Sequence, residues 1–390
     1  TDSTYPIQYS IYAGAGVTIH KTGAIVNESG GSENILGTLK APGAEVPTLT
    51  DSAAASNSIY NSSDQGGPTY KDSSDVPNTI TVHVTPSGDL TGVEDYTNIA
   101  AALAAVDVDG NGTVVLGRGA FYVYAPLTVP ARCHLRGMSR HTTSLNRPTW
   151  ADVDTEYMLE ALGTVSDLYL NCNLKCRGIH CEDVRDTQVA LREIYIYKSV
   201  ALGVFADSCY TSSFENLYFG LCEGAGIDAT DPNATTWSNI RFSSCGAVAP
   251  FDYCMRIRNG TSAVDSVKVL NFSTENCDLT DKPAIELIQC SNIEFDGIRS
   301  EGDTLTSYYA HMTATNSGFG NNIRFRRVLV QDVDEFFNAE TYSAITLEDV
   351  ITSTVTNLVV LNGGTHINPK IINAKTAVTK ANYVALEGGA

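Results

Sequence analysis

The sequence predicts an all-β protein built as a parallel β-helix, a solenoid of short stacked strands. One strand phrase returns from about residue 168 to residue 345, and the first aliphatic residues of its first seven copies are 26, 23, 23, 27, 26 and 30 residues apart. Periods of about 20 to 50 residues are typical of solenoids. Apolar residues alternate within each copy, which indicates a strand with one buried face. The copies are Asp167-Leu168-Tyr169-Leu170, Glu193-Ile194-Tyr195-Ile196, Asn216-Leu217-Tyr218-Phe219, Asn239-Ile240-Arg241-Phe242, Val267-Lys268-Val269, Asn292-Ile293-Glu294-Phe295 and Asn322-Ile323-Arg324-Phe325.

A second strand follows several of these phrases after roughly 10 to 20 residues, so several strands make up one coil. In such a coil each inward residue stacks on its equivalent in the next coil, about 4.8 Å away. Cysteine fits these ladders, and Cys222 and Cys245 both lie five residues after their anchors. We therefore expect the ten cysteines to be buried free thiols. The second strands are Arg177-Gly178-Ile179-His180, Leu202-Gly203-Val204-Phe205, Ala225-Gly226-Ile227-Asp228 and Ala284-Ile285-Glu286-Leu287.

The first ninety residues are predicted to be an extended arm. They are rich in Ser, Thr, Ala, Gly and Asn, with short alternating runs only at residues 7–11, 17–19 and 80–84. Residues 40–78 carry four prolines among small polar residues, which indicates an extended linker or an arm that folds against a partner.

Regular structure begins with a short apolar helix over residues 97–106 and a strand over residues 113–116. The turn between them starts like a calcium loop at Asp107, but its twelfth position is Arg118 where a bidentate Glu is needed. Cys172, Cys176 and Cys181 lack the Cys-x-x-Cys pair of a zinc site. We expect neither a metal nor another cofactor.

The block after this helix resembles a known family. It reads Gly117-Arg118-Gly119-Ala120-Phe121-Tyr122-Val123, then Ala125-Pro126-Leu127-Thr128-Val129-Pro130, then Cys133-His134-Leu135-Arg136-Gly137-Met138. It is similar to the opening coils of the pectate-lyase-like right-handed parallel β-helix superfamily, particularly of phage tailspike and tail-fibre proteins. The usual Pro-x-Gly is replaced here by Gly117-Arg118-Gly119, and nothing resembles the calcium-binding aspartates and catalytic arginine of pectate lyases.

The resemblance implies a right-handed, single-stranded parallel β-helix whose open end is capped by the N-terminal helix. The expected domains are an N-terminal arm or virion anchor at residues 1–90, a β-helix body at 91–350, and terminal coils with a C-terminal cap at 351–390. One solenoid fold carries lyases, hydrolases, esterases and inert fibres, so the resemblance is specific for the fold and not for the chemistry.

The function that the resemblance implies is that of a phage tailspike-like receptor-binding protein, which binds and depolymerises a host cell-surface polysaccharide as a glycosidase. It further implies a homotrimer in the phage tail, joined to other virion proteins through the arm. The chain starts at Thr1 without a signal peptide, so we expect assembly in the host cytoplasm and action outside the cell. The alternatives are a non-enzymatic virion fibre or decoration protein and a bacterial polysaccharide lyase.

Charge and hydropathy exclude two other classes of partner. The net charge of −19 and the isoelectric point near 4.6 disfavour nucleic acid and anionic lipid. No apolar run reaches the roughly 18 residues that a membrane span needs, so we expect no membrane insertion.

Register points to Glu275 and Glu301 as the candidate catalytic pair. Both lie eight residues after their anchors, Val267 and Ile293. They are therefore expected to stack one coil apart at roughly 5 Å, close to the carboxyl separation of about 5 to 5.5 Å in retaining glycosidases. A wider pair would suit inversion, and the alternates are Asp278 and Asp303. The other interpretation is that these carboxylates only solvate the outer turns.

Arginines and tyrosines near this pair are candidates for substrate binding. The arginines could hold an acidic sugar, although on a surface this negative such arginines more often pair with local acids. Tyr308 and Tyr309 fall in a long gap between coils, where they either protrude to stack on sugar rings or belong to the second strand. No Ser-His-Asp signature, phosphate loop or His-Glu-x-x-His motif is present in the sequence. The arginines are Arg299, Arg324 and Arg326.

Overall fold

The computed structural model divides the chain into two compact units, Thr1–Ile80 and Thr81–Ala390. Its description covers residues 17–19, 25–27, 48–49, 58–62, 67–71, 81–107, 112–153, 156–182, 188–245, 253–260, 264–279, 282–305, 308–313, 322–331, 333–340, 344–353, 355–362, 370–376 and 385–387.

The first unit contains short strands. β1 (Val17–Ile19) pairs antiparallel with β2 (Ile25–Asn27). β4 (Ser58–Ser62) pairs parallel with β3 (Thr48–Leu49) and antiparallel with β5 (Gly67–Lys71). Strands thus occur within the segment interpreted as a linker, while the predicted run at residues 7–11 lies outside the described residues.

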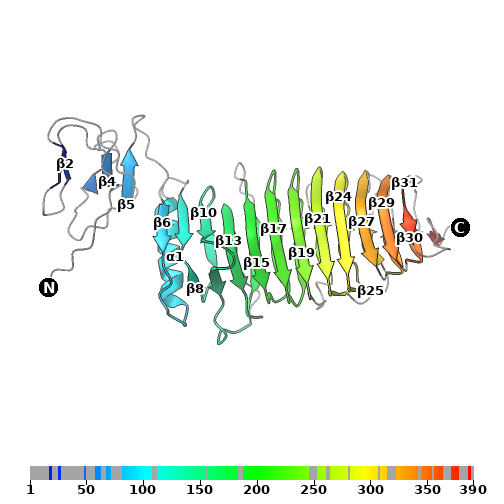
Figure 1. The fold of residues 1–390 in the computed structure, drawn as a ribbon, viewed down its shortest axis with the longest axis horizontal. Coiled ribbons are helices and arrows are strands. Elements are labelled where there is room, and N and C mark those ends of the chain that lie inside the picture. Colours follow the sequence, from blue (N-terminus) through cyan, green and yellow to red (C-terminus); the bar gives the residue numbers. More distant parts are fainter. Residues whose placement is uncertain are drawn as a thin grey trace. The chain divides into compact units, whose positions relative to one another are not determined.

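The second unit is a parallel β solenoid, as predicted. Its first sheet stacks one strand per coil, every neighbouring pair being parallel, from the cyan end to the red end in Figure 1. The strands along it are β6 (Thr81–Val84), β7 (Thr113–Leu116), β10 (His134–Gly137), β13 (Thr164–Asn171), β15 (Ala190–Tyr197), β17 (Ser213–Gly220), β19 (Thr236–Ser243), β21 (Val267–Glu275), β24 (Ile293–Glu301), β27 (Ile323–Gln331), β29 (Ile345–Ser353) and β31 (Lys370–Ile372), with β8 (Gly119–Tyr122), β11 (Thr143–Asn146) and β32 (Lys375–Thr376) paired beside them.

A second parallel sheet forms another side of each coil, and a short ladder of β22 (Asp278–Leu279) and β25 (Thr304–Leu305) lies apart from both. The predicted second strands all belong to this second sheet. Its members are β9 (Leu127–Val129), β12 (Tyr157–Ala161), β14 (Arg177–Glu182), β16 (Leu202–Asp207), β18 (Ala225–Thr230), β20 (Met255–Arg258), β23 (Ile285–Ile288), β26 (Tyr308–Thr313), β28 (Glu335–Ala339), β30 (Asn357–Asn362) and β33 (Ala385–Glu387).

The predicted helix is confirmed as α1 (Val93–Asp107), beside β6 in Figure 1. Asp89 caps it by accepting hydrogen bonds from the backbone N–H groups of Val93 and Glu94, both at 3.0 Å, and these bonds lower the pKa of Asp89 to about 2. The fully buried Asp95 accepts bonds from the N–H groups of Ser87 and Tyr122 at 2.8 Å. These contacts fix the helix to the first coil. Within the described residues, no helix is long and apolar enough to cross a membrane.

Each long strand of the first sheet bends at one residue of positive φ. Asn and Asp tolerate this conformation better than other non-glycine residues, which explains why so many strand phrases begin with them. The amides at the bends form a ladder: Asn216 donates to Glu193 at 2.7 Å, Asn239 to Asn216 at 2.7 Å and Asn271 to Asn239 at 2.9 Å. The bend residues are Asp167, Glu193, Asn216, Asn239, Asn271, Gly297, Arg327 and Asp349.

The bend also corrects one predicted register. Ile240 pairs with Phe272, and not with the predicted anchor Val267. Each strand has one set of inward-facing residues before the bend and a second set after it. The predicted register matched Ile240, which follows the bend of β19, with Val267, which precedes the bend of β21. The residue equivalent to Ile240 is Phe272. Cys277 lies five residues after Phe272, so it occupies the same position in its coil as Cys222 and Cys245 do in theirs.

The core lies between the sheets and is built from stacked like residues. Phe219 stacks on Phe242 with ring centroids 4.7 Å apart. Glycine on the second sheet makes room for these rings, because a Cβ on Gly226 would lie 1.8 Å from Cε1 of Phe242. All ten cysteines are buried and free, as predicted.

Candidate functional site

Glu275 and Glu301 stack on neighbouring strands, so their predicted register is confirmed. They are Cα partners in β21 and β24, and their side chains are 34% and 58% exposed. An arginine holds each carboxylate: Arg241 pairs with Glu275, and Arg299 binds Glu301 at 2.5 Å. The two acids and Arg299 therefore share the outer face of the first sheet, in the half of the strands that follows the bend.

Two other predicted residues are buried. Tyr309 is fully buried, and Asp303 is 8% exposed. Tyr309 lies on β26, so the alternative that it belongs to the second strand of its coil is confirmed, and Asp303, near a corner of the coil, is too buried to face a substrate groove. Tyr308 is half-buried on β26 of the second sheet, where its ring lies 4.8 Å from that of His311. It therefore belongs to a different sheet from the glutamates.

The remaining predicted residues lie elsewhere on the coil. Asp278 is exposed on β22. Arg324 binds Glu348 at 2.5 Å, and Arg326 lies 3.2 Å from Glu348 and 3.4 Å from Glu294. Both arginines precede the bend of β27 and pair with local acids, which was the alternative interpretation for them.

Asp303 is a buried carboxyl with three hydrogen-bond donors. It accepts bonds from the Thr274 hydroxyl, from the Ser300 hydroxyl at 2.7 Å and from the backbone N–H of Cys277 at 2.8 Å. Burial outweighs these bonds and raises the pKa of Asp303 to about 6. Its full set of partners gives this residue a structural role at the corner.

We predict that Asp303→Asn removes a pH dependence of stability. The folded-state pKa of Asp303 lies above the ordinary value of 3.8 for an Asp side chain, so protonation favours the folded state. The stabilisation is complete below about pH 4 and is lost as the pH rises through about 6, a span of about 2 to 3 kcal/mol. Asn cannot ionise, its one oxygen can still accept from the Cys277 N–H, and its NH2 group can donate to the Thr274 and Ser300 hydroxyls, which can turn to accept. The variant should therefore unfold at a higher temperature than the parent at pH 7.5. Melting curves from pH 4 to 8 test this, with the exposed Asp152→Asn as control; parallel curves for parent and variant would contradict it.

A ladder of tyrosines, which the sequence analysis did not single out, occupies the same outer face. The rings of Tyr169 and Tyr195 lie 5.0 Å apart at 89°, and those of Tyr195 and Tyr218 lie 4.9 Å apart at 72°. Arg241 continues the row, with its guanidinium 4.9 Å from the Tyr218 ring. Partial burial raises the pKa of Tyr169 and of Tyr195, which keeps these phenols protonated. The signal was in the sequence, since the third residue of each early phrase is Tyr, Tyr, Tyr and then Arg.

A pocket of about 330 Å³ opens on this face. Its floor includes the amides of the bend ladder, and Arg140 reaches it from the β10–β11 connection to lie 3.3 Å from Glu193. Arg241 lines the pocket and binds Glu275, so this carboxylate is held next to it. Phenols, amides, guanidinium groups and carboxylates thus surround one open depression, a set suited to a ring-shaped ligand with many hydroxyl groups. Six of its residues are Arg140, Glu193, Tyr218, Asn239, Arg241 and Ser273.

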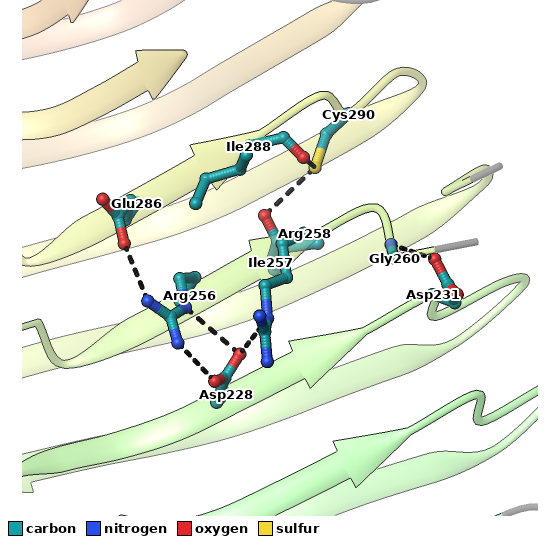
Figure 2. Close-up of polar contacts among 9 residues, drawn as sticks. All are labelled: Asp228, Asp231, Arg256, Ile257, Arg258, Gly260, Glu286, Ile288 and Cys290. Carbon is teal, nitrogen blue, oxygen red and sulfur yellow. Dashed lines mark hydrogen bonds and ion pairs between the residues drawn. The ribbon is translucent and has the colours of Figure 1, made fainter. Parts of the chain in front are cut away.

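The second sheet carries a separate polar cluster, which Figure 2 shows. Asp228 is 1% exposed and accepts hydrogen bonds from Arg256 at 2.6 and 3.2 Å and from Arg258 at 3.2 Å. Arg256 also lies 3.6 Å from Glu286, and its guanidinium stacks 4.4 Å from the ring of Tyr253. Both oxygens of this buried carboxylate are paired with arginines, and loss of either partner would leave a buried charge unpaired, so we assign this cluster a structural role. Among the residues that the structure describes, no group of three or more His, Cys, Asp or Glu side chains could hold a metal ion.

Comparison with known proteins identifies the fold. No protein-family model and no curated protein sequence matches this chain. The endo-xylogalacturonan hydrolase from Aspergillus tubingensis matches with a TM-score of 0.55 at 13% identity, over 78% of this chain and 95% of its own. The polygalacturonase from Erwinia carotovora matches with a TM-score of 0.51 at 11% identity, over 79% and 97%. The ORF18 protein of Geobacillus virus E2 matches with a TM-score of 0.48 at 10% identity, over 76% of this chain, which spans 62% of the viral protein.

The two enzyme structures confirm the expected fold. This chain folds as a right-handed parallel β-helix, the fold that it shares with those two enzymes.

Proposed function

We propose that this protein binds a polysaccharide along the outer face of the first sheet and cleaves it with Glu275 and Glu301. The observation that carries the proposal is the tyrosine ladder running into the pocket beside Glu275. Tyrosine offers an apolar ring face and a hydroxyl together, which matches the apolar and hydroxylated sides of a sugar. Glu275 and Glu301 lie on β21 and β24, the next strands along the same face.

The length of this face favours a polymer over a single sugar. The face runs from β13 to β24 through β15, β17, β19 and β21. Strands in a sheet are about 4.8 Å apart, so these five steps span roughly 24 Å, the length of several sugar units. A polysaccharide lying across the strands would contact one rung after another.

The two carboxylates have complementary roles in the proposed cleavage. One protonates the glycosidic oxygen as that bond breaks, and the other attacks or stabilises the anomeric carbon. Arg241 and Arg299 position the carboxylates through their ion pairs. Asp278 is the alternate acid, since it is exposed three residues after Glu275 on the same coil.

The wider assignment is a phage tailspike-like receptor-binding protein. The capped solenoid and the opening block of sequence support it. On this proposal the part of the chain before β6 attaches a homotrimer to other virion proteins of the phage tail, since β6 (Thr81–Val84) already pairs with β7 of the solenoid. The solenoid forms the body, and residues 351–390 close it. The polysaccharide is then a host cell-surface polymer. Mass photometry tests the assembly, and a stable monomer would count against it.

We predict that Tyr195→Ala weakens polysaccharide binding by roughly thirtyfold, because a central tyrosine of a binding surface typically contributes about 2 kcal/mol. Binding is measured by interferometry against a panel of purified bacterial surface polysaccharides. Tyr308→Ala on the second sheet is the matched control and should bind like the parent. Equal loss in both variants, or none in Tyr195→Ala, would remove the ladder from the binding site.

A further inference from the structure

A serine and a histidine from adjacent coils meet on the first sheet, outside the pocket. Nε2 of His134 in β10 lies 2.9 Å from Oγ of Ser166 in β13. These residues are 32 positions apart in the sequence, which is why no motif revealed them. The Ser166 hydroxyl also donates to Oδ2 of Asp167 at 2.8 Å. Two acceptors, an imidazole and a carboxylate, can therefore take the single proton of this hydroxyl.

Two arginines flank the serine. Arg136 and Arg192 are the Cα partners of Ser166 in the coils before and after it. Both side chains are 55% exposed. Arg136 donates from Nε to Asp167 at 3.2 Å, and Arg192 contacts Ser213 at 3.5 Å. Exposed guanidinium groups thus lie on both sides of Ser166, which is itself only 6% exposed and whose hydroxyl lies within hydrogen-bond distance of both His134 and Asp167.

We infer that Ser166 and His134 form a nucleophile and general-base pair that hydrolyses carboxylic esters, with an O-acyl group on the bound polysaccharide as the substrate. The choice of substrate rests on the proposed function. Tyr169, the first rung of the ladder, follows Ser166 by three residues on β13, roughly 10 Å along the strand. A glycan lying on the ladder would bring its substituents within reach.

The chemistry is balanced by these groups and water. Oγ of Ser166 attacks the ester carbonyl carbon while Nε2 of His134 takes the hydroxyl proton. The carbon–oxygen bond to the sugar breaks, and His134 returns the proton to the sugar hydroxyl that leaves. Water then attacks the acyl-serine with His134 again as base, which releases the carboxylic acid and restores Ser166. Arg136 and Arg192 stabilise the negative oxygen of each tetrahedral intermediate.

His134 is suited to act as the base. Burial, with a further contribution from the charge of Arg136, lowers the pKa of its imidazole. The ring is therefore neutral at pH 7 and can accept a proton. The hydroxyl proton of Ser166 points to Asp167 in this arrangement and has to turn toward Nε2 of His134 before Oγ attacks, while Arg136 holds the Asp167 carboxylate in place.

The test uses the full chain and two probes that need no polysaccharide. A fluorophosphonate should label Ser166, located by peptide mass mapping, and p-nitrophenyl acetate should be turned over catalytically. Ser166→Ala should abolish the label, and both Ser166→Ala and His134→Gln should lower ester turnover at least a hundredfold. Ser213→Ala is the control, because Ser213 also contacts Arg192 on this face, and it should keep the activity of the parent.

Each outcome decides the inference. Absence of a Ser166 adduct from the parent protein, or full turnover by a folded Ser166→Ala variant, overturns it whether or not any polysaccharide binds. If Ser166→Ala does not fold, the His134→Gln variant decides: loss of the label supports the inference, and labelling as in the parent overturns it. Labelling together with failure of every polysaccharide in the panel to bind supports the esterase pair and counts against the proposed glycan function. Acetate released from an O-acetylated polysaccharide by the parent, and not by Ser166→Ala, supports the assigned substrate.

Discussion

Replacing Glu275 or Glu301 with Gln is expected to lower the rate of polysaccharide cleavage by about 10²- to 10⁴-fold, the usual contribution of a general acid or base. Gln keeps the shape of the side chain and can still hydrogen-bond to Arg241 or Arg299, but it cannot donate or accept the catalytic proton. Binding should remain close to that of the parent, because the tyrosine ladder is unchanged. The melting temperature should also change little, since both side chains lie outside the core.

Release of reducing ends from the bound polysaccharide, measured alongside affinity, tests this result. Glu348→Gln is a matched control, because Glu348 is also ion-paired to an arginine on the first sheet but lies before the bend. Parental rates in both Gln variants would show that the acid lies elsewhere, and Asp278→Asn would be examined next. If the parent cleaves no polysaccharide that it binds, Glu275 and Glu301 are not a glycosidase pair and the fibre alternative is favoured.

Ile240→Asp is expected to unfold or strongly destabilise the solenoid, by several kcal/mol, because it buries an unpaired carboxylate. Ile240 is fully buried and stacks against Phe272 of the next coil. Asp offers no apolar contact at this position, and the ladder gives it no hydrogen-bond donor. The coils formed by β17, β19 and β21 should lose their structure first.

Thermal unfolding and hydrogen exchange measure this effect. The control is Thr236→Asp, which places the same charge at an exposed position on the same strand. A soluble Ile240→Asp protein with the melting temperature of the parent would show that this side chain does not belong to the core.

The fold could be predicted from the sequence because the repeat consists of inward-facing apolar residues at regular spacing. The alternation around Leu168, Ile194 and Leu217 identified the strands, and the helix and opening block identified the capped end. The register error at Val267 arose because a bend at Asn271 divides β21 into two strand-like halves. Spacing alone does not distinguish the first half of one strand from the second half of another.

The candidate site was predicted in part. The stacking of Glu275 on Glu301 was predicted correctly because their anchors, Val267 and Ile293, both precede the bend and are themselves paired. Asp303 was misplaced because it lies at a corner, where the alternation of inward and outward residues is interrupted. For Tyr309 the spacing left two positions open, and the structure has the one on the second strand, β26. The contact between His134 and Ser166 depends on the register of two whole coils, and no local pattern encodes it.

The equal spacing of the early coils has an evolutionary consequence. Ile194, Leu217 and Ile240 follow one another at intervals of 23 residues, and each interval adds one strand to the ladder face. Duplication or loss of one such segment would lengthen or shorten the surface by a single rung of about 4.8 Å, leaving the rungs on either side intact. A change in the number of segments would therefore alter the length of the outer face while leaving β21 and β24, which carry Glu275 and Glu301, as they are.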